Sequence, residues 1–465
     1  MYFEQFYLGC LAHASYMLGS EGEAVVVDPQ RDVEIYLEAA MTQNLQIRHI
    51  FETHLHADFV SGHRELAART GATIYIGKAA GATFPHVDVT DGFELRVGKL
   101  RIEALETPGH TPESICLVIT DEEESQQPWA VLTGDTLFIG DVGRPDLSKT
   151  HTPQQLAGLM YDSLHSKLLT LPDSTKVYPA HGAGSLCGRN MRAERSSTIG
   201  TERLTNYALQ ISGRDEFIRQ MTTNLPARPD YFLEDAAINR AGATPLTELP
   251  ELKPISASEL NTMLVRGAIA LDVRPGSEFA AGHVPGSVNI ALSGQFASWA
   301  GAVLGLSSRP VLMAGTTDQL SEARMRLARV GIEDLTGYLD GGVEGWQRAG
   351  LELAQTSQIT VQELSGRLND RDLQVLDVRR QGEWEAGHLA DADWYPLDRF
   401  KAALPPLDPK ATIAVHCAGG YRSMIACSFL QRAGHANVIN LVGGFDAWAK
   451  AGLPVAGQAA AGAKA

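Results

Sequence analysis

The stretch FETHLHADFVSGHREL at residues 51–66 carries His54, His56 and Asp58 on alternate positions, directly after a short apolar run. Imidazole and carboxylate groups spaced in this way at the end of a strand are typical of metal ligands. In the metal-binding pattern His-x-His-x-Asp-His a further histidine follows the aspartate, but this chain has Phe59 at that place. The stretch therefore predicts a metal site from which one familiar ligand is missing.

More histidines and another aspartate occur where further strands are expected to end. They are His110 in TPGHT, Asp135 in TGDT and His181 in PAHG. A single histidine of this kind is most often a structural polar residue. In this chain, however, such residues recur at the ends of several expected strands, beside glycine and threonine turns. Loops at these places leave room for a substrate, so the recurrence indicates a metal site. His63 is expected to begin the helix after the metal loop, and His13 has no supporting context.

Length and composition limit the classes of function. A chain of 465 residues predicts two to four domains, and its net charge of −16 argues against nucleic acid and anionic membrane as partners. No apolar run approaches the roughly 18 residues of a membrane span, and MYFEQFYLGC does not resemble a secretion signal. The five cysteines are widely spaced, which predicts reduced thiols and a cytoplasmic location. They are Cys10, Cys116, Cys187, Cys417 and Cys427.

Residues 1–245 contain many expected strands and few helices, which predicts a large α/β sandwich. The expected strands are 23–29, 47–54, 72–77, 100–110, 115–120, 129–135 and 176–182, and the expected helices are 32–44 and 152–171. The proline-rich segment 226–256 is predicted to be a linker, and residues 456–465 a frayed tail.

The rest of the chain contains an internal repeat. LDVRPGSEFAAGHVPGSVNI at 271–290 matches LDVRRQGEWEAGHLADADWY at 376–395. The repeat predicts two domains of about 100 residues, 253–355 and 357–456. Short apolar strands alternate with helical patterns in both, which predicts parallel sheets covered on both faces by helices.

VHCAGGYRSMIAC at 415–427 is the second strong signal for chemistry. A strand leads to Cys417 in a glycine loop, and a helix follows. The backbone N–H groups of such a loop and the helix N-terminus both favour a thiolate and would hold a bound persulfide anion. The residues expected to bind that anion are Gly419, Gly420, Arg422 and Ser423. Cys427, inside the expected helix, is predicted to be a core residue.

The first repeat lacks this nucleophile. VLMAGTTDQLSEA places Ala314 at the Cys417 position and Gln319 at the Arg422 position. Alanine cannot carry sulfur. Residues 253–355 are therefore predicted to be an inactive copy that packs, spaces or docks the other domains.

The N-terminal part resembles the metallo-β-lactamase fold, a four-layer αββα sandwich, through THLHAD, TPGHT, TGDTLF and PAHG. Within that superfamily it is most similar to persulfide dioxygenases, through the Gly-Arg-x-Asp segment at 143–146. The resemblance implies one Fe(II) per chain, held by His54, His110 and Asp135, with positions open for O2 and a thiolate-type substrate. The residues that would orient these ligands and hydrogen-bond substrate or water are His56, Asp58 and His181.

Phe59 bears on a second metal. Binuclear hydrolases of this fold use a histidine at that position for their second ion, so Phe59 argues against a two-metal clamp. Arg144 is a candidate substrate-binding residue. Cys187 follows His181 by six residues in a glycine-rich loop, and two roles stay open for it. It is either a small buried residue or a thiol that receives or steers persulfide sulfur.

The two repeats resemble the rhodanese family, and the loop from Cys417 to Arg422 has the six-residue length of its sulfur-transferring members. The whole order resembles bacterial fusions of persulfide dioxygenase with sulfurtransferase. This implies sulfide detoxification. The persulfide of a small thiol, such as glutathione or coenzyme A, is oxidised by O2 to a sulfinated thiol that hydrolyses to sulfite. Cys417 exchanges sulfane sulfur with sulfite or thiosulfate. Homologues of this fold often pair, so a homo-oligomer is expected.

Two other functions stay open from the sequence. One is a zinc-dependent thioester hydrolase of the glyoxalase II kind with the rhodanese as a passenger, and Phe59 argues against it. The other is a non-catalytic sulfur carrier or persulfide sensor that uses Cys417 alone. The full set of metal-ligand residues argues against a sensor, because a sensor would need no iron.

Overall fold

The computed structural model describes residues 1–225 and 227–457, and these form two compact units. The first comprises Met1–Leu249 with Ala328–Gly331, and the second comprises the remaining described residues. The predicted tail at 456–465 lies mostly outside the described residues. In the part of the chain that is described, no helix has the length and apolar character needed to cross a bilayer.

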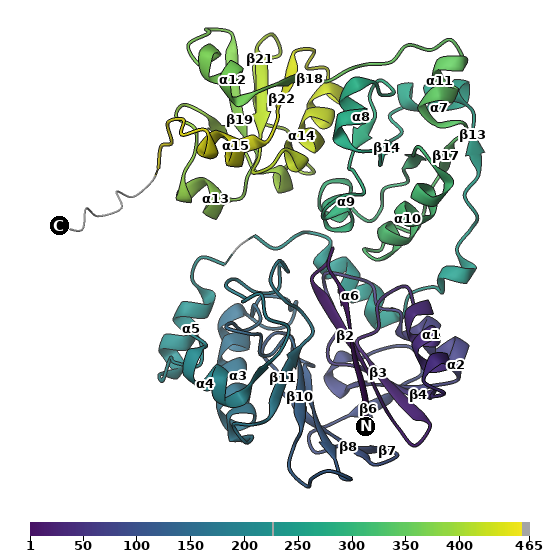
Figure 1. The fold of residues 1–465 in the computed structure, drawn as a ribbon, viewed down its shortest axis with the longest axis vertical. Helices are drawn as coiled ribbons and strands as arrows, with labels where there is room; N and C mark the ends of the chain where they lie inside the picture. The colour runs from purple at the N-terminus through teal and green to yellow at the C-terminus, as the bar shows by residue number, and fades with distance from the viewer. Residues whose placement is uncertain (226, 458–465) are drawn as a thin grey trace, which may run out of the picture. The chain divides into compact units, whose positions relative to one another are not determined.

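Two six-stranded sheets form the centre of the first unit (Figure 1). The first sheet runs in the order β1 Tyr2–Leu8, β2 His13–Ser20, β3 Glu23–Val27, β4 Gln46–Glu52, β5 Thr73–Gly77 and β6 Val87–Val89. The second runs in the order β12 Ser197–Thr198, β11 Lys176–Pro179, β10 Ala130–Gly134, β9 Ile115–Asp121, β8 Leu100–Glu106 and β7 Glu94–Val97. The seven strands expected from sequence are all present, but five others were not predicted: the antiparallel pair β1 and β2 at one edge, and the short strands β6, β7 and β12.

Helices cover the outer face of each sheet (Figure 1). They are α1 Glu34–Thr42 and α2 His63–Thr70 beside the first sheet, and α3 Pro153–Ser166, α4 Ile199–Thr205 and α5 Arg214–Thr222 beside the second. The prediction that His63 begins a helix is confirmed. The four layers are those of the predicted αββα sandwich.

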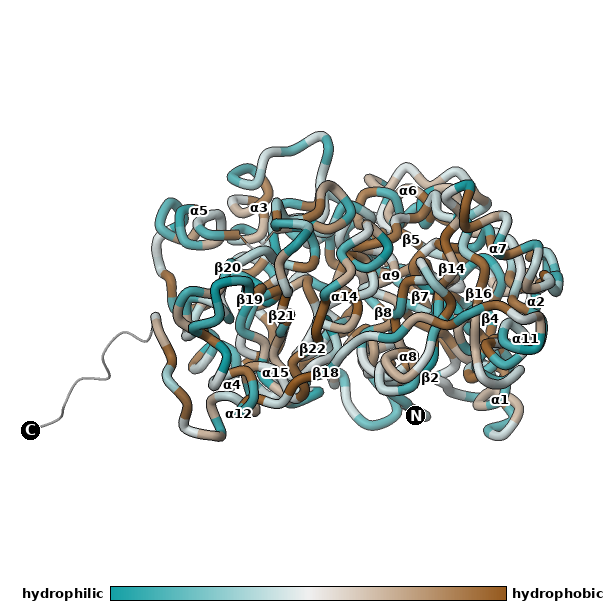
Figure 2. Tube along the Cα trace, turned by 90° about the horizontal axis from the view of Figure 1, so that it is seen from above, coloured by the Kyte–Doolittle hydropathy of each residue, from teal (hydrophilic) through white to brown (hydrophobic). Residues whose placement is uncertain are grey.

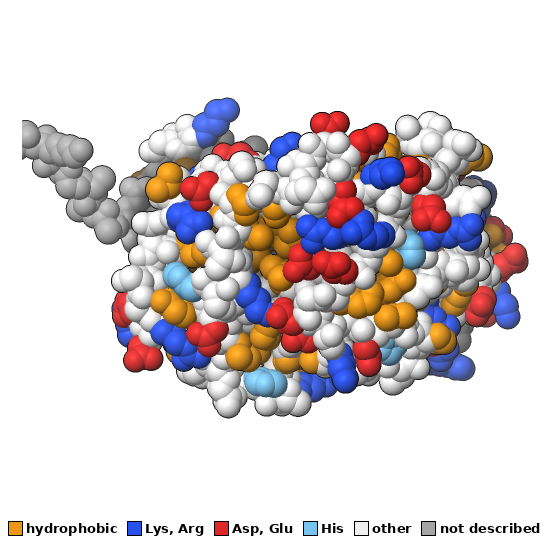
Figure 3. Space-filling model, turned by 90° about the horizontal axis from the view of Figure 1, so that it is seen from below, with side chains coloured by type: hydrophobic (Ala, Val, Ile, Leu, Met, Phe, Trp, Pro, Cys, Tyr) orange, Lys and Arg blue, Asp and Glu red, His pale blue; other side chains and the backbone are white. Residues whose placement is uncertain are grey.

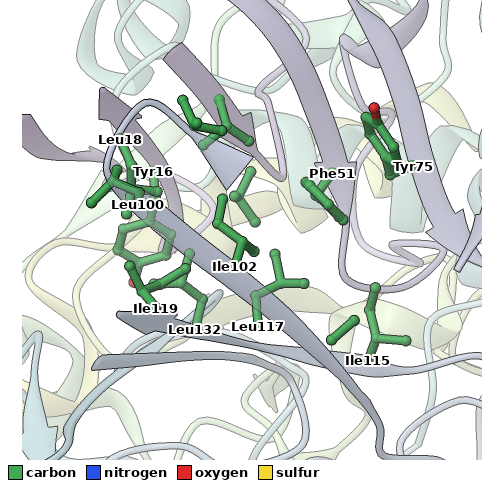
Figure 4. Close-up of a cluster of buried hydrophobic side chains, with 14 of the residues drawn as sticks. Tyr16, Leu18, Phe51, Tyr75, Leu100, Ile102, Ile115, Leu117, Ile119 and Leu132 are labelled. Atoms are coloured by element: carbon green, nitrogen blue, oxygen red, sulfur yellow. The ribbon is translucent and has the colours of Figure 1, made fainter. Parts of the chain in front are cut away.

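The alternation of side chains along the strands explains these layers. In β3, Val25 and Val27 join the core between the sheets, whereas Ala24 and Val26 face the helices of the first sheet. Successive side chains of a strand point to opposite faces, so a strand buried on both faces is apolar throughout. Figure 4 shows the core between the sheets, where Phe51 and Tyr75 lie on one side and Ile102 and Leu117 on the other.

The prediction of a linker at 226–256 is wrong for most of that segment. Residues Phe232–Ala241 form the helix α6, and Asn239 on this helix is fully buried. The prolines that suggested a linker flank the helix instead of interrupting it, at positions where proline is tolerated. Residues 227–249 belong to the first unit, with consequences for the metal loop described below, whereas β13 Pro254–Ile255 belongs to the second.

The second unit contains two five-stranded sheets, and every strand pair in them is parallel, as predicted. The first sheet has the order β13 Pro254–Ile255, β17 Gly337–Leu339, β16 Val311–Met313, β14 Ala270–Asp272 and β15 Val288–Asn289. The second has the order β18 Ser357–Ile359, β22 Val438–Leu441, β21 Thr412–His416, β19 Leu373–Asp377 and β20 Asp393–Trp394. Both sheets share one strand order, as the internal repeat requires.

Helices alternate with these strands. In the first repeat they are α7 Ala257–Val265, α8 Gly276–Ala281, α9 Phe296–Leu304, α10 Thr317–Ala328 and α11 Gly342–Arg348. In the second they are α12 Val361–Arg367, α13 Gln381–Ala386, α14 Tyr421–Arg432 and α15 Gly444–Lys450. Figure 2 shows hydrophobic stretches along β21 and β22, which the helices bury.

The surface carries charges of both signs. On the face shown in Figure 3, lysine and arginine side chains are interspersed with aspartate and glutamate.

Candidate metal centre and candidate thiol site

Strand ends bring the predicted metal ligands together. The loop between β4 and α2 supplies His54, and the turn between β8 and β9 supplies His110. Asp135 directly follows β10. All three side chains are buried, and one possible ligand atom of each lies within 4.8 Å of the others. A second buried group of the same kind consists of His56, Asp58 and His181.

The first group fits a metal ion. Nε2 of His54 lies 3.8 Å and Nε2 of His110 lies 3.4 Å from the Oδ2 atom of Asp135. Neither nitrogen has a hydrogen-bond partner among residues 1–225 and 227–457. Buried polar atoms without a partner are costly. Two imidazoles and one carboxylate facing a common point would be satisfied by a divalent cation.

Hydrogen bonds set the tautomers of both histidines. The Thr53 hydroxyl donates to Asp28 over 2.9 Å, so Nδ1–H of His54 donates to Thr53 Oγ1 over 3.0 Å. Nδ1 of His110 lies 3.0 Å from the carbonyl oxygen of Arg144 and must donate to it. Each Nε2 therefore keeps its lone pair, which is the form that binds a metal. Burial lowers the pKa of His54 and of His110, which keeps both rings neutral.

Thr53→Val should weaken metal binding about 10- to 100-fold, because it removes the acceptor that fixes the His54 ring. The measurement is a competition titration of the apoprotein between a divalent metal and a chelator. Thr175→Val is the matched control, since the Thr175 hydroxyl is buried without a partner in the described chain. Equal affinities for the two variants would show that Thr53 does not orient His54.

His181 connects the two groups. Its Nδ1 lies 2.8 Å from Oδ1 of Asp135 and its Nε2 lies 3.0 Å from Oδ2 of Asp58. Burial alone would lower the pKa of His181, but the two carboxylates outweigh it and raise this pKa well above its usual value. His56 contacts Asp28 at 3.2 Å. His181, Asp58 and His56 therefore place polar and charged side chains beside the first group, and His181 contacts its Asp135 carboxylate directly.

Phe59 fills the position that lacks a ligand. Its ring is buried, with its centroid 4.4 Å from that of His56 and 4.1 Å from that of His13. Both ring nitrogens of His13 are buried, and no residue of the described chain bonds to them. His13 had no supporting context in the sequence, because it begins β2, two strands from β4, and meets the site through backbone pairing with His181.

Two further supporting residues were also missed. Asp28 accepts hydrogen bonds from the backbone N–H and the hydroxyl of Thr53. Asn239 donates from its amide to the carbonyl oxygens of His56 and Phe59, at 2.8 Å each. Asn239 thus ties α6 to the metal loop. Asp28 follows an apolar strand as the predicted ligands do, which was a usable signal, whereas Asn239 had none.

Cys187 and Arg144 lie beside this centre. The sulfur of Cys187 belongs to a buried group of possible ligand atoms with Asp135 and His181. Burial, followed by the charges of Asp58 and Asp135, raises the pKa of Cys187 well above its usual value and favours the neutral thiol. Arg144 forms a two-point ion pair with Asp146 at 2.6 and 2.8 Å and donates to the carbonyl of Leu186. Its guanidinium therefore braces the loop that carries Cys187.

The second site surrounds Cys417, which follows β21 and is buried. The N–H of Gly420 donates to its sulfur over 3.1 Å, and Gly420 has a φ of 101°, which favours glycine. The hydroxyl of Ser423 is 3.7 Å from the sulfur and donates to Asn440 over 2.7 Å. In the described part of the chain, Gly419 makes no hydrogen bond to the sulfur. A backbone donor at the start of α14 therefore faces the thiol, as the loop pattern predicts.

The glycine pair Gly443 and Gly444, at the start of α15, lies against the backbone of this loop. A Cβ atom on Gly444 would lie 2.4 Å from the carbonyl oxygens of both Cys417 and Ala418, which no side chain tolerates. The close approach lets the N–H of Phe445 donate to the Cys417 carbonyl over 2.7 Å. The glycine is therefore required to orient the loop N–H groups toward the sulfur.

Arg422 is held by a carboxylate. Its two terminal nitrogens each lie 2.6 Å from an oxygen of Glu383 on α13. Burial raises the pKa of Glu383, but Arg422 outweighs it and lowers this pKa below its usual value. Burial lowers the pKa of Arg422, while Glu383 and the nearby Cys417 raise it above its usual value. The guanidinium therefore stays charged between the carboxylate and the sulfur.

Strand register confirms that the first repeat lacks the nucleophile. Asp272 pairs with Met313 and Asp377 pairs with His416, and the following residues are Ala314 and Cys417. Ala314 therefore occupies the place that Cys417 has in the second repeat. The side chain of Gln319 folds back on its own loop and accepts from the N–H of Gly315 over 2.8 Å.

Comparison with known proteins identifies three matching regions. Residues 8–181 match the metallo-beta-lactamase superfamily, and residues 256–349 and 360–451 each match the rhodanese-like domain. The mouse mitochondrial persulfide dioxygenase ETHE1 is 32% identical over 221 residues, which are 46% of this chain and 77% of that protein. A hydroxyacylglutathione hydrolase from Polaromonas sp. is 37% identical over 163 residues, which cover 34% of this chain and 57% of that protein.

A solved structure extends the match beyond the first unit. The metallo-beta-lactamase from Staphylococcus aureus subsp. aureus COL superposes with a TM-score of 0.65 and 33% identity. The match covers 72% of this chain and 98% of that one.

Proposed function

Because this chain belongs to the persulfide dioxygenase family through its N-terminal domain, and carries two rhodanese-like domains after it, we propose that it oxidises a small-thiol persulfide with O2 and transfers sulfane sulfur at Cys417. The proposed domains are 1–245 for the oxidation, 253–355 for the inactive rhodanese and 357–456 for the active one. The observation that carries the proposal is the buried group of His54, His110 and Asp135, with two unpartnered imidazole nitrogens.

The proposed cofactor is a single Fe(II) per chain, held by His54, His110 and Asp135. When bound, it would provide open positions at which O2 and a sulfur anion can meet. Other residues of the chain hold these ligand side chains in position. Thr53 and the Arg144 carbonyl hold the two rings, and His181 holds the Asp135 carboxylate. The buried thiol of Cys187, whose sulfur lies within 4.8 Å of possible ligand atoms of Asp135 and His181, is proposed to contact the persulfide.

The proposed sulfur transfer at Cys417 needs no metal. The Cys417 thiolate attacks the outer sulfur of thiosulfate or of a persulfide, and the donor S–S bond breaks. Sulfite or the parent thiol leaves with the electron pair. The new Cys417 persulfide is held by the Gly420 N–H and faces the charged Arg422. Attack by sulfite or a thiol on its outer sulfur restores the Cys417 thiolate and completes the cycle.

One observation favours a second candidate function. His56, Asp58 and His181 form another buried group of possible ligands, and the Polaromonas relative is a hydroxyacylglutathione hydrolase. A two-metal thioester hydrolase would use both groups. Against it stands Phe59, whose ring adds no ligand to the second group.

Metal analysis separates these two functions. Protein purified without O2 should contain about one iron per chain and should take up O2 with glutathione persulfide or coenzyme A persulfide. Phe59→His, which restores the missing imidazole, should raise the metal content toward two per chain. Two tightly bound zinc ions in the parent protein, together with thioester hydrolysis, would establish the hydrolase instead.

A further inference from the structure

One face of α14, the helix that follows the catalytic loop, packs on the inactive rhodanese-like domain. Tyr421, Met424, Ser428 and Arg432 make these contacts, at intervals of three, four and four residues. Side chains at this spacing lie on one face of an α-helix. The catalytic loop and the inactive domain are therefore linked through a single element.

The far end of this face is bound mainly to backbone. Ser428 accepts from the N–H of Asn289 over 3.1 Å, and Arg432 donates to the carbonyl oxygens of Gly286 and Gly267 over 2.7 and 2.9 Å. These contacts lie about two and three helical turns beyond Tyr421, the first residue of α14. They attach the helix without touching the catalytic loop.

The near end of the face lies within the catalytic loop. The Tyr421 hydroxyl donates to the carbonyl oxygen of Ala291 over 2.8 Å. A Cβ atom on Gly294 would meet the Tyr421 ring at 3.4 Å, so the ring rests against that glycine. Burial raises the pKa of the Tyr421 hydroxyl, which keeps it a hydrogen-bond donor.

The Ala291 carbonyl oxygen, which accepts the hydrogen bond from Tyr421, lies in a segment that is itself held in place. Arg326 on α10 of the inactive domain donates to the carbonyl oxygens of Leu292 and Gly294. The chain from Ala291 to Gly294 is thus held by Arg326 as well as by Tyr421. A fixed acceptor can hold a catalytic loop in place, whereas a mobile one could not.

We propose that Tyr421 is a positioning residue for sulfur transfer, anchored on Ala291 of the inactive domain so that the adjacent Gly420 N–H stays directed at the Cys417 sulfur. Tyr421 directly follows Gly420, so a shift of its ring moves this N–H. The domain that lost its cysteine thereby supports the reaction of the domain that kept it. The inference rests on the proposed transfer at Cys417.

Tyr421→Phe tests this by removing only the hydroxyl. We expect kcat for sulfur transfer from thiosulfate to cyanide to fall about five-fold, the effect of one neutral hydrogen bond, with KM for thiosulfate unchanged. The rate at which iodoacetamide alkylates Cys417, followed by mass spectrometry of its peptide, should fall by a similar factor. Arg432→Gln is the matched control. It breaks hydrogen bonds of the same interface away from the loop and should leave both rates unchanged.

Thermal unfolding of both variants shows whether they lose stability equally. Equal falls in kcat for the two variants, or an unchanged kcat in Tyr421→Phe, would overturn the positioning role. If the parent protein transfers no sulfur, the proposed function fails. The alkylation rates then still decide the positioning role, because they require only the thiol. A Tyr421→Phe rate no lower than that of Arg432→Gln would refute it.

Discussion

Asp135→Asn should lose its iron and all persulfide-dependent O2 uptake while keeping its fold and its sulfurtransferase activity. The amide preserves the shape of the side chain but removes the negative charge that a divalent cation needs. Asp135 is the only carboxylate in the proposed ligand group. Burial raises its pKa, but His181, His54 and His110 outweigh it and lower this pKa well below its usual value, so the group is ionised at neutral pH.

The measurements are iron content by elemental analysis, O2 uptake at an electrode and sulfur transfer from thiosulfate to cyanide. Asp121→Asn is a matched control, because Asp121 is a buried aspartate at the end of β9 that belongs to neither ligand group. It should keep iron and O2 uptake. An Asp135→Asn protein that still consumes O2 with a persulfide would show that the ligand group is misassigned.

Cys417→Ser should abolish sulfur transfer and leave O2 uptake largely intact. Serine cannot form a persulfide, and the proposed metal ligands belong to another domain. Sulfite should then accumulate where the parent protein makes or consumes thiosulfate. The assays are transfer from thiosulfate to cyanide and chromatographic separation of sulfite from thiosulfate.

Cys427→Ala is the matched control for this variant. Cys427 is buried in α14 behind the loop, and burial raises the pKa of its thiol. Sulfur transfer should persist in Cys427→Ala. Loss of O2 uptake in Cys417→Ser would mean that the two sites are chemically coupled and do not act independently.

Much of the architecture could be predicted because it depends on local patterns. Apolar strands flanked by turns, such as 115–120, predicted the sandwich. The internal repeat predicted two parallel sheets, and these have the same strand order. The antiparallel strands β1 and β2 were missed because aromatic and polar residues obscure their alternation. Helix α6 was missed because prolines on either side of it suggested a linker.

The sequence by itself determined which groups are available for chemistry. His54, His110 and Asp135 follow strands of a sandwich, so their meeting at one edge was predictable. Likewise, Phe59 and Ala314 cannot bind a metal or carry sulfur in any conformation. These conclusions require only the identity of a residue and its place next to a strand.

The tertiary structure alone decided how these groups are supported. His13 packs on Phe59, Asn239 holds the metal loop from 180 residues away, and Tyr421 reaches Ala291 across 130 residues. Such contacts join positions far apart in the chain, and their partners are mostly backbone carbonyls that every residue possesses. A backbone acceptor leaves no trace in the sequence, so only the folded chain shows which carbonyl faces which donor.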